Sequence, residues 1–319
     1  MQCTINFVNN PLKVYKPGAT IELLIELQVN ETINVEEIFL KIIGQAKCEF
    51  LSRKKGKPLT ACVNYLEKKI SLLNISQIEP GMYDFDANFQ LPYDIPSTME
   101  CIKGYWKNAN GSIKYKLEVH VTSLWKPNWK FDNNFTVIAP LDLNQLSPVM
   151  HVPLMQEVMR KFSFDFSSKE LYMSASIPQR GYTPGEAICV TVNLHNMTRV
   201  RIQSVRISLN KIMVLTSQKP IVEVVRILIV ETLEYCDQVK PQLHRIFSKT
   251  LRVPAVEPNI DNCEIIKVGY EIAVKAKPSG MHRSVLLNIP VLIGTVALKN
   301  EQQQVVRRIS YSSFETELQ

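Results

Sequence analysis

The stretch VYKPGATIELLIEL, residues 14–27, recurs later in the chain as GYTPGEAICVTVNL, residues 181–194. Proline followed by glycine is typical of the two central positions of a type II turn, because proline presets φ and glycine tolerates a positive φ. Apolar and polar residues then alternate, which indicates a strand with one buried face. Both copies therefore predict a turn, centred on Pro17-Gly18 and on Pro184-Gly185, that leads into a half-buried strand.

The segments downstream of the two copies also follow one order. FQLPYDIP at residues 89–96 is followed by GSIKYKLEV at 111–119, and LRVPAVEP at 251–258 is followed by NCEIIKVGYEIAV at 262–274. In each case a segment with two prolines precedes a strand that carries tyrosine on its apolar face. This repeated order predicts a duplicated domain.

The chain has 319 residues, enough for two ordinary domain cores, and its 45% hydrophobic and 21% charged residues are typical of a globular protein. We expect one domain at residues 1–140, a linker at 141–165, a second domain at 166–298 and a polar tail at 299–319. No convincing helical periodicity is visible. The fold class expected is all-β, with two tandem antiparallel immunoglobulin-like β-sandwich domains.

Alternating segments predict individual strands in both halves. In the first half they are 20–29, 35–51, 62–73, 82–91, 113–121 and 135–138. In the second half they are 171–177, 188–194, 205–215, 221–234, 246–253, 265–274 and 284–293.

Charge and cysteine content limit the class of protein. The net charge is +7, with 16 Lys and Arg against 15 Asp and Glu in residues 1–150, and 21 against 15 in residues 151–319. This dispersed excess favours anionic surfaces and phosphorylated partners and argues against nucleic-acid binding. The seven cysteines form no Cys-x-x-Cys pair. Together with the absence of a visible secretory signal, this predicts a cytosolic protein.

With these motifs together, the chain resembles the α-arrestins, which are arrestin-domain trafficking adaptors. The resemblance covers about residues 3–298 and rests on the ordered motifs above and on IPVLIGT at residues 289–295. It implies two arrestin-like domains and a non-enzymatic cytoplasmic adaptor, found partly at the plasma membrane or endosomes. Such an adaptor binds the tails of membrane-protein cargo such as receptors and transporters. It promotes their ubiquitination, endocytosis or sorting.

One expected partner is qualified by the sequence. It contains no Pro-Pro-x-Tyr motif of the kind that recruits WW-domain ubiquitin ligases, so we expect ligase recruitment to be weak or indirect.

Two alternatives to the adaptor stay open. A sorting-coat component, like the arrestin-like subunit of retromer, is the other trafficking role. An enzyme is the less favoured class, because no catalytic, metal or nucleotide motif is present; we assign no catalytic residue, no metal site and no cofactor.

Six basic residues are candidates for contact with anions or lipid. Arg53, Lys54, Lys55 and Lys57 form the densest charge cluster, at an expected hairpin tip, and Lys13 and Lys16 flank the first turn. For both groups the alternative is ordinary solvation of a loop.

Three further sets of residues are weighed in the same way. Ser310 follows Arg307-Arg308 and is a candidate phosphorylation site in the tail. The five histidines have no metal-ligand spacing and are expected to be surface residues. Cys48 and Cys62 are close enough in the expected hairpin to face each other, and two free thiols are favoured over a disulfide.

Overall fold

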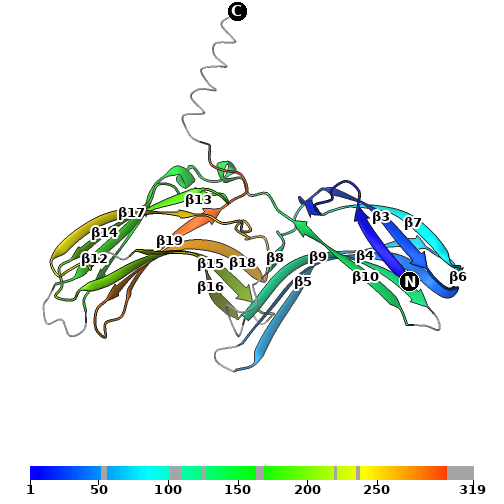
Figure 1. Ribbon diagram of the computed structural model, residues 1–319, viewed down its shortest axis with the longest axis horizontal. Coiled ribbons are helices and arrows are strands. Elements are labelled where there is room, and N and C mark those ends of the chain that lie inside the picture. The colour runs from blue at the N-terminus through cyan, green and yellow to red at the C-terminus, as the bar shows by residue number, and fades with distance from the viewer. Residues whose placement is uncertain are drawn as a thin grey trace, which may run out of the picture. The chain divides into compact units, whose positions relative to one another are not determined.

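The computed structural model describes residues 1–51, 56–100, 109–123, 127–162, 169–218, 221–234 and 238–299. Within these ranges the regular elements are strands and two short 3-10 helices, η1 (Leu143–Gln145) and η2 (Pro148–His151). Figure 1 shows these strands arranged as sheets stacked face to face in each half of the chain. The predicted all-β class with two sandwiches is confirmed.

The strands of the first half form two sheets. The smaller sheet has the order β1-β3-β7 and the larger has β2-β10-β9-β4-β5, with β6 paired to β4 and β8 to β9. Their bounds are β1 (Gln2–Phe7), β2 (Val14–Tyr15), β3 (Thr20–Val29), β4 (Ile33–Leu51), β5 (Pro58–Leu73), β6 (Gln77–Ile78), β7 (Gly81–Gln90), β8 (Met99–Glu100), β9 (Ala109–Ser123) and β10 (Trp129–Val137).

The strands of the second half repeat this plan. One sheet has the order β11-β12-β14-β17 and the other has β13-β19-β18-β15-β16. Their bounds are β11 (Leu154–Arg160), β12 (Leu171–Ile177), β13 (Gly181–Tyr182), β14 (Ala187–Asn196), β15 (Ile202–Thr216), β16 (Val222–Glu234), β17 (Leu243–Arg252), β18 (Ile266–Pro278) and β19 (Val285–Ile293).

The backbone divides into two compact units, each made of three separate segments of the chain. Unit 1 contains Met1–Ala139, Met213–Val225 and Ile260–Val268; unit 2 contains Pro140–Ile212, Arg226–Asn259 and Gly269–Gln319. The residue bounds expected from the sequence for the domains and linker stay a prediction. Within the expected linker, η1, η2 and β11 are formed, and β11 pairs with β12.

The two turn motifs have the same backbone geometry. Gly18 has φ +79° and Gly185 has φ +91°. The turns close by hydrogen bonds from the Ala19 amide to the Lys16 carbonyl and from the Glu186 amide to the Thr183 carbonyl, both 3.1 Å long. Glycine is needed at the third turn position because other L-residues rarely adopt this φ.

The strands after these turns bury alternate side chains in one pattern. In β3, Ile21, Leu23, Ile25, Leu27 and Val29 are buried, and the corresponding positions of β14 are buried as well. Leu27 and Val29 belong to a cluster that joins the two sheets of the first half, with Ile38 from β4 and Val121 from β9. Burial of this apolar face, worth about 25 cal/mol per Å², holds each sandwich together.

Two tyrosines also occupy matching places. The hydroxyl of Tyr115 in β9 donates to the Pro96 carbonyl, and that of Tyr270 in β18 donates to the Glu257 carbonyl, both at 2.7 Å. Each acceptor lies at the end of a two-proline segment recognised in the sequence. The buried hydroxyls therefore tie these segments to the sheets in both halves.

Candidate functional site

The basic residues singled out from the sequence have different environments. Arg53, Lys54 and Lys55 lie outside the described residues, as does Ser310. Lys57 is exposed immediately before β5, and Lys16 is exposed on the first turn. Contact of these residues with lipid or phosphate stays a prediction.

Lys13 is engaged with the fold. It has a φ of 57°, its amide donates to the Asn10 carbonyl and its carbonyl accepts from Thr136. Its ammonium group donates to Asn133 Oδ1 at 3.0 Å and lies 5.4 Å from the centroid of the Phe7 ring. An anion at Lys13 would therefore compete with an existing hydrogen bond.

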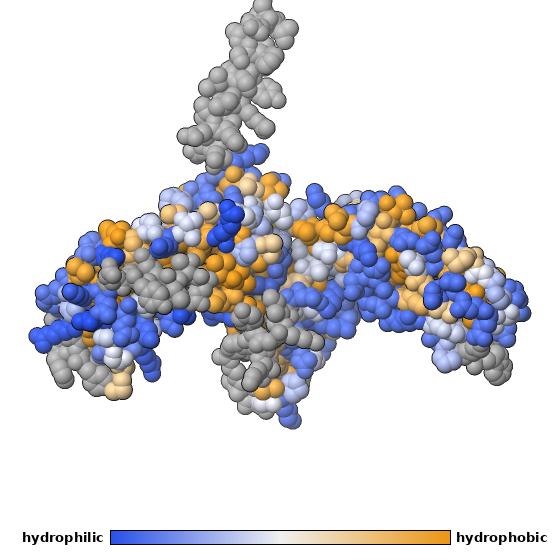
Figure 2. All heavy atoms as spheres, in the orientation of Figure 1, coloured by the Kyte–Doolittle hydropathy of each residue, from blue (hydrophilic) through white to orange (hydrophobic). Residues whose placement is uncertain are grey.

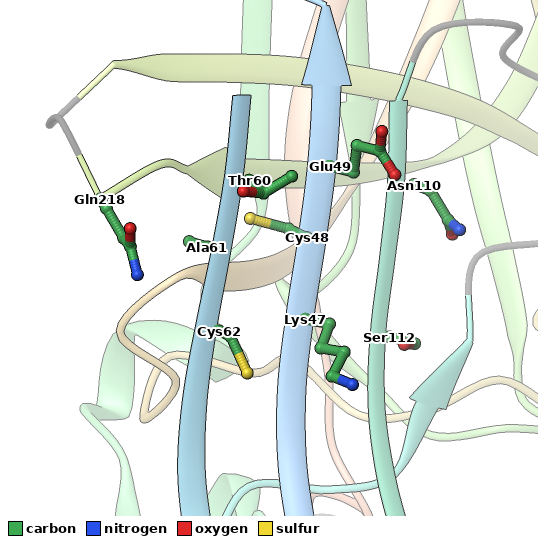
Figure 3. A pocket seen from close by; sticks show the side chains of 9 residues that line it. All are labelled: Lys47, Cys48, Glu49, Thr60, Ala61, Cys62, Asn110, Ser112 and Gln218. Atoms are coloured by element: carbon green, nitrogen blue, oxygen red, sulfur yellow. The ribbon is translucent and has the colours of Figure 1, made fainter. Parts of the chain in front are cut away.

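A pocket of about 320 Å³ lies on the strands that lead into the β4–β5 hairpin (Figure 3). We call it the hairpin pocket. Its lining comes from β4, β5, β9 and the segment after β15. The lining residues are Lys47, Cys48, Glu49, Thr60, Ala61, Cys62, Asn110, Ser112 and Gln218.

Sheet register explains how these side chains meet. Lys47 lies between Ser112 and Cys62 on the neighbouring strands, and Glu49 lies between Asn110 and Thr60. Because side chains two residues apart share a face, Lys47 and Glu49 lie on one face of β4, with their Cα atoms about 7 Å apart. The pocket can therefore present one positive group, one negative group, hydroxyls and amides to an extended polar segment.

The two cysteines of the pocket do not face each other, so the expectation that they might is wrong. Cys48 pairs with Ala61, and Cys62 pairs with Lys47, which places the two thiols on opposite faces of the sheet. Cys48 is buried and its thiol donates to the Thr216 carbonyl at 3.4 Å. Burial raises the pKa of Cys48 to about 11, which keeps this thiol protonated at neutral pH.

The outward face of the same sheet holds a buried carboxylate, Glu118, which is only 3% exposed. Lys116 and Lys130 form ion pairs with it, and His120 Nε2 lies 3.0 Å from Glu118 Oε2. The His120 ring stacks on Phe39 with centroids 4.9 Å apart. His120 is therefore half-buried in a network and is not a plain surface residue. Hydrophilic residues cover much of β4, β9 and β10 in the view of Figure 2.

Glu118 gives the first testable prediction. Burial alone would raise its pKa, but hydrogen bonds from Lys116, Lys130 and His120 outweigh burial and lower the pKa to about 2. A depressed carboxylate pKa stabilises the native state above the unfolded value and loses this effect as the pH falls through the folded value. Glu118→Gln should therefore cost about 1–3 kcal/mol at pH 7 and clearly less at pH 3.

Urea unfolding of both proteins at the two pH values measures this difference. The exposed Glu36, changed to glutamine, is the matched control and should have little effect at either pH. A loss for Glu118→Gln that is equal at pH 7 and pH 3 would contradict the assigned role of the charge.

Sequence reasoning missed the hairpin pocket and the Glu118 network. Alternation in 35–51 and 113–121 places Lys47, Glu49 and Glu118 on the polar faces, but only register shows their neighbours. In the described part of the chain, no three His, Cys, Asp or Glu side chains gather in a way that could hold a metal. The same residues include no helix long and apolar enough to span a membrane.

Each half of the chain matches a family of known proteins. Residues 3–144 match the family "Arrestin (or S-antigen), N-terminal domain", and residues 167–298 match "Arrestin (or S-antigen), C-terminal domain". Human arrestin domain-containing protein 4 is 25% identical over 314 residues, covering 88% of this chain and 68% of the relative.

Two other relatives are similar over comparable lengths. Rat arrestin domain-containing protein 1 is 22% identical over 288 residues, covering 89% of this chain and 62% of the relative. Human thioredoxin-interacting protein is 22% identical over 299 residues, covering 90% and 73%. The two family matches lie in the order that the duplicated motifs predict. The chain therefore belongs to the arrestin family and is an α-arrestin-like protein with an N-terminal and a C-terminal arrestin domain.

Proposed function

We propose that this protein is a non-enzymatic adaptor of the cytoplasm that binds the tails of membrane-protein cargo and promotes their ubiquitination, endocytosis or sorting. The observation that carries this proposal is the pair of arrestin domains in one chain, at residues 3–144 and 167–298. Ligase recruitment is indirect in this proposal, because the sequence has no Pro-Pro-x-Tyr motif. The adaptor works partly at the plasma membrane or endosomes.

The hairpin pocket is the proposed place for part of the cargo tail. Lys47 and Glu49 carry opposite charges on one face, and both are exposed. An extended peptide with an acidic and a basic residue two positions apart matches this spacing, because its side chains also repeat every second residue. The amides of Asn110 and Gln218 add donors and acceptors suited to a peptide backbone.

Exchanging the two charges tests the pocket without altering net charge. The double variant Lys47→Glu, Glu49→Lys should recover about tenfold less cargo than the wild type, equivalent to roughly 1.4 kcal/mol, because each charge then meets its like. Proximity labelling in cells followed by mass spectrometry measures cargo recovery. The double variant Glu36→Lys, Lys68→Glu exchanges two exposed charges outside the pocket and is the matched control.

The labelled proteins distinguish the alternatives. Receptors or transporters that fall away only in the Lys47/Glu49 exchange support both the adaptor and its pocket. Cargo labelling that persists in both variants would contradict cargo binding at the hairpin pocket but would still support the adaptor role. A constant set of coat subunits would favour the retromer-like role, and labelling of neither group would contradict trafficking altogether.

A further inference from the structure

Two histidines from distant parts of the sequence meet on the outer face of a sheet in unit 2. His195 lies near the end of β14 and His244 near the start of β17, and the two residues are direct cross-strand partners. Their ring centroids are 5.4 Å apart with an interplanar angle of 49°. Both side chains are exposed, so packing in the core does not account for their pairing.

A neighbouring amide orients one of the rings. His244 Nε2 lies 2.7 Å from Asn193 Oδ1, and this oxygen only accepts hydrogen bonds. The hydrogen of the neutral ring is therefore on Nε2, and the lone pair is on Nδ1. Fixing one ring nitrogen as a donor so that the other can bind a metal is the usual second contact of a metal-binding histidine.

The backbone around the pair is also held in place. Asn196, which follows His195 and is fully buried, donates through Nδ2 to the carbonyls of Val200, Val239 and Lys240, at 2.8, 3.3 and 3.3 Å. These bonds tie the end of β14 to the segment that enters β17. The two histidines therefore keep their relative position before any ligand arrives, which lowers the entropic cost of binding.

We propose that His195 and His244 form a two-histidine chelate for a divalent transition-metal ion. Directly opposite residues of antiparallel strands have Cβ atoms about 4.5–5.5 Å apart, close enough for two imidazoles to reach one ion. Imidazole nitrogen suits zinc, copper, nickel and cobalt. Tyr172 faces His195 from β12, but its hydroxyl donates to Glu157 at 2.9 Å, so it is not assigned as a ligand. Water completes the coordination of the ion.

The test is a titration of the purified full chain with Co²⁺, under reducing conditions, followed by calorimetry and absorption spectroscopy. We expect one Co²⁺ to bind at this site and to raise the unfolding temperature, because the ligands are together only in the folded state. His195→Ala and His244→Ala should each lower the affinity at least about tenfold, and the double variant should lose this site. Asn193→Ala, which keeps both ligands, should weaken binding by about tenfold.

His151→Ala is the matched control, because His151 is an exposed histidine in η2, and it should bind Co²⁺ as the wild type does. The absorption spectrum separates histidine from cysteine ligation, since thiolate ligands give intense charge-transfer bands with Co²⁺. The proposal would be overturned by equal binding in the wild type and the double variant, by thiolate bands that account for all bound metal, or by no binding to the wild type.

Discussion

Replacing Gly44 by alanine is expected to destabilise unit 1 by about 1–3 kcal/mol, the usual cost of overpacking a core. A Cβ atom at Gly44 would lie 2.5 Å from Tyr115 Cε1 and 2.9 Å from Leu66 Cβ. Moving the ring of Tyr115 aside would cost free energy, because the residue is 1% exposed and its hydroxyl donates a hydrogen bond to the Pro96 carbonyl. Urea unfolding followed by tryptophan fluorescence measures the loss, since Trp106, Trp125 and Trp129 are the only tryptophans.

Gly81→Ala is the matched control for this substitution. A Cβ atom there comes no closer than 3.6 Å to Tyr83, which is ordinary contact, so its stability should be equal to or slightly above that of the wild type. Combining Gly44→Ala with Tyr115→Leu should cost less than the sum of the two single changes, because the clash with the tyrosine ring is removed and only the contact with Leu66 remains. Strictly additive losses would show that contact with the tyrosine ring is not the reason why position 44 requires glycine.

Tyr115→Phe and Tyr270→Phe are each expected to cost about 1–3 kcal/mol, because each leaves a carbonyl without its partner in a largely buried setting. The lost bonds are the 2.7 Å contacts to Pro96 and Glu257. Burial raises the pKa of both phenols, in keeping with their enclosed position. Tryptophan fluorescence reports the first variant. Hydrogen exchange of β18 reports the second, because the second half of the chain has no tryptophan.

Tyr83→Phe removes the same kind of bond in an exposed setting and serves as the control. Its hydroxyl donates to the Glu79 carbonyl at 2.9 Å, where water can replace it. This change should therefore cost well under 1 kcal/mol. Losses as small for Tyr115→Phe and Tyr270→Phe would mean that the two hydroxyl bonds contribute little to holding the two-proline segments.

The two tyrosines make equivalent contacts in the two halves of the chain. Each tyrosine binds the equivalent loop of its own half to the sheet, although the residues around the two tyrosines differ. In the second half the carboxylate of Glu257 also pairs with Lys211, which is 5% exposed. The hydroxyl bond is common to both halves, whereas the ion pair is a contact of unit 2.

The sequence by itself determined the class of fold, the duplication and the family. Alternation in residues 20–29 and 188–194 shows which side chains are buried, and Pro-Gly marks both turns, because these are local effects of backbone geometry and burial. It did not reveal β1 and β11. β1 is a strand of only six residues, too short for its alternation to stand out in the sequence. In β11 every side chain is exposed or half-exposed, so its apolar pattern is weak.

Only the tertiary structure decided which polar residues act together. His195 and His244, or Lys47 with Ser112 and Cys62, are brought together by strand register, and a shift of one residue would send their side chains to opposite faces. The same holds for Gly44 under the Tyr115 ring. Residues far apart along the chain carry no local signal of such pairing, because register depends on the packing of whole sheets.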